Sequence, residues 1–381
     1  MVWTCFSLVG EFHYVMRQPG PRTGWLGWRS VPGGGPGERR RLIAEQGRSV
    51  ADLGEWGVIA AIAERMPAGS LTSVGIGDDA AVVGAPSGSV VAAVDLLLEG
   101  RHFRLDWSSA YDIGVKAAAR SLADIAAMGA VNTALLVGMA APGTLPATWP
   151  VELADGLAAE ASRAGAGIVG GDTARADSVV LSVTALGDLA GRPPVLRSGA
   201  RPGDVIAVAG PLGRSAAGLA LLAAGVAADA TSAALAGLVA AHLRPSPPYP
   251  AGPEAAGLGA TAMIDVSDGL LADLGHVAAA SGVAVDIDSS SLVTGGPLGE
   301  AAAALREKPS DSYGTDRAFS APSIALEWVL TGGEDHSLVA AFPASAALPS
   351  SWRVIGHVRA GAGVTVDGAP RVGPGGWQHF R

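Results

Sequence analysis

Two adjacent carboxylates on a glycine-rich turn are the clearest chemical feature of the chain. They stand in Gly75-Ile76-Gly77-Asp78-Asp79, and the apolar run Ala80-Ala81-Val82-Val83 follows them. We interpret the run as a buried strand, which would hold two hard oxygen ligands at the end of a rigid element and favours a Mg²⁺ site. Two alternatives stay open. One is a solvated surface hairpin turn, and the other is a loose dinucleotide-binding fingerprint, in which two unshielded carboxylates would repel a pyrophosphate.

Two more aspartates accompany expected elements. Asp95 closes the apolar run of residues 89–95, a buried strand by its β-branched content, and it either stands at the strand's edge or merely starts a loop. Asp124 lies on or beside the apolar face of a helix expected over residues 111–128. A carboxylate there is costly to bury unless it is paired or bound to a metal. Asp124 is therefore a candidate site residue.

Two segments of the sequence combine an apolar run, a pair of glycines and a carboxylate. Gly170-Gly171-Asp172 follows Ile168-Val169, and Gly332-Gly333-Glu334 follows Trp328-Val329-Leu330, which we read as strand-like. A related segment, Asp265-Val266-Ser267-Asp268-Gly269, precedes a helix expected from Leu270. Ser267 or Asp268 would serve there as an N-cap or would help to hold metal and phosphate at the start of the helix.

The order of elements predicts two α/β domains behind an atypical N-terminal segment. Residues 1–50 are arginine- and glycine-rich, and we interpret them as disordered or as an over-extended translation start. Residues 51–190 form the expected N-terminal domain and residues 200–381 the C-terminal domain. Arg197 lies in the linker, where it is suited either to phosphate or to solvent. Residues 306–323 are polar and rich in serine and proline, as expected of a loop.

Composition excludes several function classes. The 35 acidic and 26 basic residues give a net charge of −9, which argues against a nucleic-acid-binding surface. The single cysteine, Cys5, allows neither an internal disulfide nor a thiolate metal site, and this points to the cytoplasm. Charges and glycines interrupt the alanine-rich run 205–243, so that we expect no membrane span.

The chemistry that remains is phosphate chemistry through oxygen-bound cations. Carboxylate ligands select Mg²⁺, Ca²⁺ or Mn²⁺, and several such ions imply a polyphosphate. The chain has no Gly-Lys-Ser/Thr phosphate loop, no protein-kinase motif set and no Gly-x-Ser-x-Gly elbow. An ATP-using enzyme of this composition would neutralise phosphates with metals and a few arginines.

Taken together and in order, these segments resemble the thiamine-monophosphate kinase family of the aminoimidazole-ribonucleotide-synthetase-like superfamily. The resemblance rests on the segments 75–80, 95–103, 121–130, 170–173, 197–200, 265–270, 332–335 and 377–380. It implies a two-domain α/β fold, whose N-terminal domains join into a barrel-like sheet in a homodimer. It also implies transfer of the γ-phosphoryl group of ATP to thiamine monophosphate by direct in-line displacement, which yields thiamine diphosphate in the last step of its biosynthesis.

The resemblance assigns roles residue by residue. Mg²⁺ would be bound by Asp78, Asp79, Asp95, Asp124, Asp172, Asp265 and Asp268. ATP would be bound by Gly171, Asp172, Arg197 and Ser267. The thiamine end of the substrate would be held by His102, Glu334 and Trp377. Ala93 and Val94 depart from the Ser-Thr pair that is common in the family, so that only backbone carbonyls could serve there.

Two rival interpretations are weaker. Another enzyme of the superfamily, acting on an acyl, amide or selenide substrate, would often need a lysine or cysteine near the start of the core, and this core has neither there. A non-catalytic binder of ATP or thiamine phosphate would have little use for carboxylates in both halves.

Overall fold

The computed structural model describes residues 49–67, 69–76, 80–226, 232–306, 321–371 and 376. The expectations for residues 1–48, for Asp78 and Asp79, and for Trp377 lie outside these ranges. The described residues belong to one compact unit within Ile43–Arg381. No helix in the described ranges is long and apolar enough to cross a membrane.

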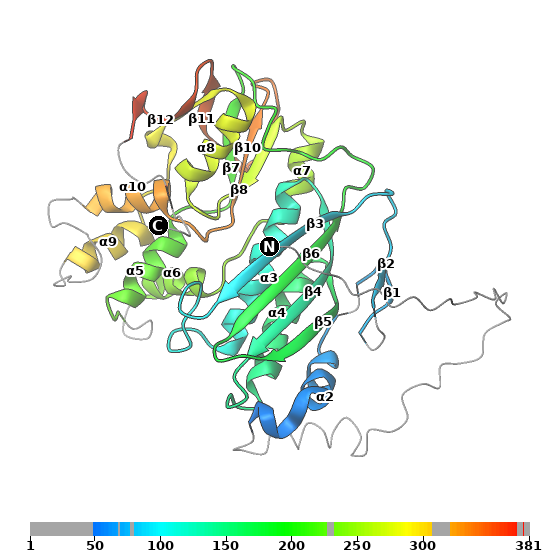
Figure 1. Ribbon diagram of the computed structural model, residues 1–381. Coiled ribbons are helices and arrows are strands. Elements are labelled where there is room, and N and C mark those ends of the chain that lie inside the picture. Colours follow the sequence, from blue (N-terminus) through cyan, green and yellow to red (C-terminus); the bar gives the residue numbers. More distant parts are fainter. Residues whose placement is uncertain are drawn as a thin grey trace, which may run out of the picture. The chain divides into compact units, whose positions relative to one another are not determined.

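The N-terminal half is built on a four-stranded sheet with helices on one face (Figure 1). Its strands, in the order β3-β6-β4-β5, are β3 (Val91–Leu98), β6 (Val180–Asp188), β4 (Val131–Ala141) and β5 (Gly167–Arg175). The helices are α3 (Ala110–Ala127) and α4 (Trp149–Ala164). Their backbones approach closely, because a Cβ at Gly114 would lie 2.2 Å from the Leu153 carbonyl oxygen. This approach fixes α3, and with it Asp124, against the sheet.

A short helix and a β-hairpin precede this sheet. Helix α2 (Val50–Ala63) packs against α4 and begins with a capping box between Ser49 and Asp52. Strands β1 (Thr72–Val74) and β2 (Val82–Val83) pair antiparallel. The expected buried strand after Asp79 is wrong, because β2 has only two residues and Val82 is 53% exposed.

The C-terminal half contains a seven-stranded, mostly antiparallel sheet (Figure 1). Its strands, in the order β13-β12-β9-β11-β7-β10-β8, are β13 (Ala369–Pro370), β12 (Gly363–Val366), β9 (Ala284–Ile287), β11 (Trp352–Arg359), β7 (Val205–Ala209), β10 (Leu338–Phe342) and β8 (Ala262–Asp265). The helices are α5 (Arg214–Ala223), α6 (Ala233–Leu243), α7 (Ala251–Gly257), α8 (Leu270–Ser281), α9 (Pro297–Arg306), α10 (Ala321–Thr331) and the 3₁₀ turn η2 (Ser289–Ser291).

Two local expectations are corrected by these elements. Residues 328–330 lie in helix α10 and not in a strand, because Ala325 and Val329 are four residues apart and both are buried on one helical face. Strand β3 continues to Leu98, so that Asp95 stands inside the strand opposite Val183 rather than at its end. Two halves of mixed helix and sheet confirm the expected α/β fold class.

Candidate active site

Helix α3 carries three charged side chains at intervals of one helical turn. Lys116, Arg120 and Asp124 are four residues apart, and residues at this spacing share one helical face. Ser109 and Asp112 form a capping box that fixes the start of the helix. Lys116 and Arg120 are buried, with 3% and 9% of their surface exposed, so this charged face is turned inward. Sequence analysis missed Lys116 and Arg120, although their spacing from Asp124 is visible in the sequence.

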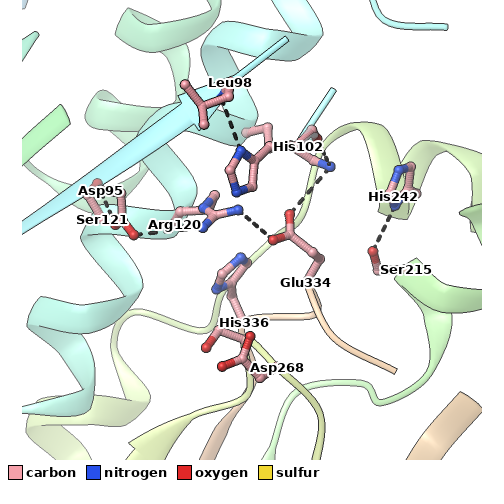
Figure 2. Close-up of polar contacts among 12 residues, drawn as sticks. Asp95, Leu98, His102, Arg120, Ser121, Ser215, His242, Asp268, Glu334 and His336 are labelled. Atoms are coloured by element: carbon pink, nitrogen blue, oxygen red, sulfur yellow. Dashed lines mark hydrogen bonds and ion pairs between the residues drawn. The ribbon is translucent and has the colours of Figure 1, made fainter. Parts of the chain in front are cut away.

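Asp95 on β3 is held against α3 by a neighbouring hydroxyl group. Ser121 donates a hydrogen bond of 2.8 Å from Oγ to Oδ2 of Asp95, and the same Oγ lies 3.1 Å from the Val183 carbonyl oxygen. Nη2 of Arg120 lies 3.8 Å from Oδ1 of Asp95 (Figure 2). The side chain of Asp95 therefore faces the charged side of α3.

Asp124 lies in the field of two further carboxylates. Burial, and then the negative charges of Asp265 and Asp95, raise the pKa of Asp124 to about 8. Asp265 ends strand β8 of the C-terminal sheet, and α3 packs against this strand. The structure thus brings together three aspartates that are distant in sequence. Within the described ranges no three His, Cys, Asp or Glu side chains converge closely enough to hold a metal ion by themselves.

The loop between β8 and α8 is organised by a buried aspartate that sequence analysis missed. The backbone N–H groups of Ser267, Asp268 and Gly269 all donate to Oδ2 of Asp273, at 3.1, 3.1 and 3.0 Å. Burial, and then the charge of Asp265, raise the pKa of Asp273 to about 7. Asp273 stands in the first turn of α8, where an acidic residue next to backbone amides is a recognisable signal.

The Gly332–Asp335 loop lies directly against this segment. Glu334 and His336 donate backbone hydrogen bonds to the carbonyl oxygens of Ser267 and Val266, at 2.8 and 2.9 Å. A Cβ at Gly333 would lie 2.3 Å from the Ser267 carbonyl oxygen, so only glycine permits this approach. The paired glycines therefore serve loop–loop packing and bring Glu334 and His336 beside Asp265.

The carboxylate of Glu334 contacts both buried cationic side chains of α3, Arg120 and Lys116. Nη1 of Arg120 donates to Oε1 at 2.5 Å (Figure 2). Nζ of Lys116 lies 3.4 Å from Oε2. Burial alone would raise the pKa of Glu334, but the charges of Lys116 and Arg120 hold that pKa well below its usual range. Asp335, the next residue, accepts hydrogen bonds from the N–H groups of Gly213 and Ser215 at the start of α5.

His336 is a further buried group that was not expected from the sequence. Its Nδ1 lies 3.1 Å from Oδ2 of Asp265, and its Nε2 has no hydrogen-bond partner among the described residues. Burial would lower the pKa of His336, but hydrogen bonding to Asp265 raises it above the usual value. The imidazole therefore helps to fix the orientation of Asp265.

The other expected site residues are placed at different distances from this cluster. Nδ1 of His102 accepts a hydrogen bond of 3.0 Å from the backbone of Leu98, beside Arg120 and Glu334 in Figure 2. Asp172 stands on β5, with β6 and β4 between it and the strand of Asp95, which corresponds to roughly 14 Å across the sheet. Arg197 is exposed, and its carbonyl oxygen accepts a hydrogen bond from Ser281. The structure thus does not bring Asp172 to the aspartates around Asp124.

An apolar pocket of about 100 Å³ adjoins Gly171 and Asp172. Its lining includes Ile62 of helix α2, Met66, and Ile76, which precedes Asp78 and Asp79 in sequence. A Cβ at Gly171 would lie 2.0 Å from the Val137 carbonyl oxygen, so close strand packing also requires this glycine. Such a pocket, lined mostly by apolar side chains with Asp172 and Thr173 beside them, is suited to a largely apolar group.

The chain matches known protein families over most of its length. Residues 77–189 match the family model of the AIR synthase related protein N-terminal domain, and residues 201–368 match that of the C-terminal domain. A thiamine-monophosphate kinase from Mycobacterium tuberculosis is 48% identical over 341 residues, which cover 89% of this chain and 95% of that relative.

Solved structures show the same relationship. A crystal structure of thiamine-monophosphate kinase from Stenotrophomonas maltophilia K279a has 34% identity and a TM-score of 0.67, and the match covers 82% of this chain and 95% of that chain. A structure of AaThiL complexed with AMPPCP and TMP has 32% identity and a TM-score of 0.67, covering 86% and 98%. These matches confirm the resemblance drawn from the motifs. The chain belongs to the thiamine-monophosphate kinase family of AIR synthase related proteins.

Proposed function

We propose that this chain phosphorylates thiamine monophosphate with ATP to give thiamine diphosphate and ADP. The observation that carries the proposal is the meeting of Asp95, Asp124 and Asp265 with Arg120 and Glu334 at one site. The bond between the γ-phosphorus and the β,γ-bridging oxygen of ATP breaks, and an oxygen of the acceptor phosphate forms the new bond. Because that acceptor is already anionic, the reaction needs no general base on the protein.

The residues around Asp124 fit a Mg²⁺ requirement. Asp95, Asp124 and Asp265 offer only oxygen donors, and the raised pKa of Asp124 reflects burial and then repulsion by Asp265 and Asp95, which a bound cation would offset. These three would hold Mg²⁺ together with Asp268, while Asp78, Asp79 and Asp172 would bind metal in the N-terminal half. When bound, Mg²⁺ shields and orients the two phosphates, which would otherwise repel each other.

The substrates are assigned to two regions of the site. ATP is assigned to Gly171 and Asp172, whose apolar pocket suits a nucleobase, and to Arg197 and Ser267. The thiamine end is assigned to His102 and Glu334, and by the resemblance to Trp377. An anionic Glu334 is appropriate here because thiamine carries a positively charged thiazolium, and Lys116 and Arg120 keep that carboxylate ionised.

The apolar outer face of β3 supports a proposed homodimer. Val94 and Leu96 alternate with inward-facing residues and are 63% and 55% exposed. A row of exposed apolar side chains on an edge strand is unusual unless another surface covers it. The family resemblance implies that a second copy of the chain covers this face of β3. We also propose a cytoplasmic location for the protein.

The direct test is product analysis by ³¹P NMR with the purified chain, thiamine monophosphate, ATP and Mg²⁺. Thiamine diphosphate and ADP should form in equal amounts, and thiamine in place of its monophosphate should give neither. Formation of ADP and free phosphate alone, or no turnover, would refute the proposed activity. Omission of Mg²⁺, with EDTA added, should stop the reaction.

A further inference from the structure

Arg120 occupies the boundary between two groups of side chains with different proposed tasks. Its Nη1 donates to Glu334 at 2.5 Å, and its Nη2 faces Asp95 at 3.8 Å (Figure 2). We propose that Arg120 binds the acceptor phosphate of thiamine monophosphate and thereby selects a phosphorylated acceptor over free thiamine. This inference rests on the proposed function.

The guanidinium group has unused donor capacity in a place that water hardly reaches. The Arg120 side chain is 10% exposed, and its Nε–H has no hydrogen-bond partner among the described residues. A buried donor without a partner costs free energy, and a ligand oxygen would recover that cost. The planar fork of arginine matches two oxygens of one phosphate group, so that a phosphate can use Nε and one Nη together.

Lys116, the other buried cation of α3, is less suited to bind a ligand phosphate. Nζ of Lys116 donates to the His102 carbonyl oxygen at 3.2 Å and faces Glu334 at 3.4 Å, and the side chain is only 3% exposed. Burial lowers the pKa of Lys116, whereas the surrounding carboxylates keep Arg120 charged. Lys116 is therefore suited to positioning Glu334, which leaves Arg120 as the cation for a ligand.

The position of Arg120 also matches the order of groups along the substrate. Glu334, assigned to the thiamine end, lies on one side of the guanidinium, and Asp95, assigned to metal, lies on the other. Thiamine monophosphate has the same order: an organic cation, its phosphate, and then the metal-bound γ-phosphoryl group that it attacks. Cations bound to the aspartates would weaken their attraction for Arg120 and free its donors for that phosphate.

The test is a comparison of two ligands by isothermal titration calorimetry, with the full-length protein, Mg²⁺ and AMPPCP present. The wild-type protein should bind thiamine monophosphate more tightly than thiamine. Arg120→Gln should weaken binding of the monophosphate about 10- to 100-fold, the range expected for charge-assisted hydrogen bonds, and should change thiamine binding less than about threefold. Arg104→Gln, an exposed arginine paired with Asp106, is the matched control and should change neither affinity.

Arg120→Lys keeps the charge and should retain part of the preference for the phosphorylated ligand, which also covers the case in which Arg120→Gln folds poorly. The proposal is overturned if Arg120→Gln and Arg120→Lys weaken both ligands equally, since Arg120 would then only support Glu334. It is likewise overturned if the wild-type protein binds the two ligands equally. The proposed kinase function fails separately if the wild-type protein binds both substrates and yields no thiamine diphosphate.

Discussion

Arg120 of helix α3 and Glu334 of the Gly332–Asp335 loop form a hydrogen-bonded ion pair of 2.5 Å that joins the two halves of the chain across 214 residues of sequence. The pair is largely buried, so that loss of either partner weakens the charge compensation of the other. Lys116 adds a second contact to Glu334 at 3.4 Å. The acidic cluster around Asp124 lies next to this pair.

Asp124→Asn should abolish kinase activity while leaving the fold intact. The substitution keeps size and hydrogen-bonding capacity but removes the negative charge that we assign to Mg²⁺. Turnover should fall by at least about 100-fold, measured as thiamine diphosphate formed at saturating ATP, because removal of one charged electrostatic contribution to a transition state commonly costs this much. Circular dichroism should be unchanged, and near-normal turnover would remove Asp124 from the site.

Asp124→Asn should also show that the negative charge of Asp124 lowers the stability of the metal-free protein. The pKa of Asp124 is about 8 in the folded protein against 3.8 for an unperturbed carboxyl group, so the folded state binds this proton more tightly. The metal-free protein should therefore lose stability as pH rises from about 4 to about 8. Asp124→Asn should stabilise the metal-free protein at pH 8 by on the order of 2 kcal/mol and have little effect at pH 4.5.

Thermal or urea unfolding in EDTA measures this difference. Saturating Mg²⁺ should reverse the order at pH 8, because only the wild-type site gains a counterion there. Equal free energies of unfolding of the two proteins at pH 8, with and without Mg²⁺, would contradict this prediction. The ionised carboxylate of Asp124 would then not destabilise the metal-free protein.

Asp273→Ala should loosen the loop of residues 265–269. Three backbone N–H groups lose their shared acceptor, and we expect a loss of about 2–3 kcal/mol in the free energy of unfolding. Asp273→Asn retains a side-chain carbonyl oxygen in the same place and should lose clearly less. Urea titrations of the two variants give the comparison, and identical losses would mean that the amide contacts do not stabilise the loop.

Gly333→Ala should separate the two loops that meet at the site. Its Cβ would lie 2.3 Å from the Ser267 carbonyl oxygen, so the backbone must move and the Arg120–Glu334 pair with it. Activity should fall by about tenfold or more, in line with the sensitivity of catalysis to displacements near 1 Å. Gly275→Ala in α8 is the control, since a Cβ there meets nothing within 4 Å, and it should leave activity unchanged. Equal activity of the two variants would contradict tight loop packing.

Charges on the outer face of β3 should break the proposed dimer. The double variant Val94→Asp and Leu96→Asp places two charges where exposed apolar side chains stand, whereas Val293→Asp alters an apolar residue of similar exposure, 57%, in the C-terminal half. Light scattering coupled to gel filtration should give a dimer for the wild-type and Val293→Asp proteins and a monomer for the double variant. A wild-type monomer would rule out this interface.

The sequence predicts regular elements well where the local pattern determines them. Helix α3 follows from apolar spacing and its capping box, and α8 begins at Leu270 as expected. The N-cap expected at Ser267 or Asp268 is wrong, because Gly269 stands at that position and no side chain caps the helix. Residues 328–330 were misread because a short apolar run does not distinguish a strand from a helix, and the deciding partner, Ala325, lies upstream.

Lys116 and Arg120 were missed for a different reason. Charged residues on a helix usually face solvent, and only the long-range contact with Glu334 makes these two inward-facing. The roles of Asp273 and His336 likewise depend on contacts between loops that no spacing in the sequence reveals.

The most direct test of the central claim is a crystal structure of the full chain with Mn²⁺, AMPPCP and thiamine monophosphate, in which anomalous scattering locates the metal. We expect manganese bound by Asp95, Asp124 and Asp265, between the γ-phosphate of the analogue and the acceptor phosphate. Manganese bound only away from these aspartates, with both ligands in place, would contradict the account.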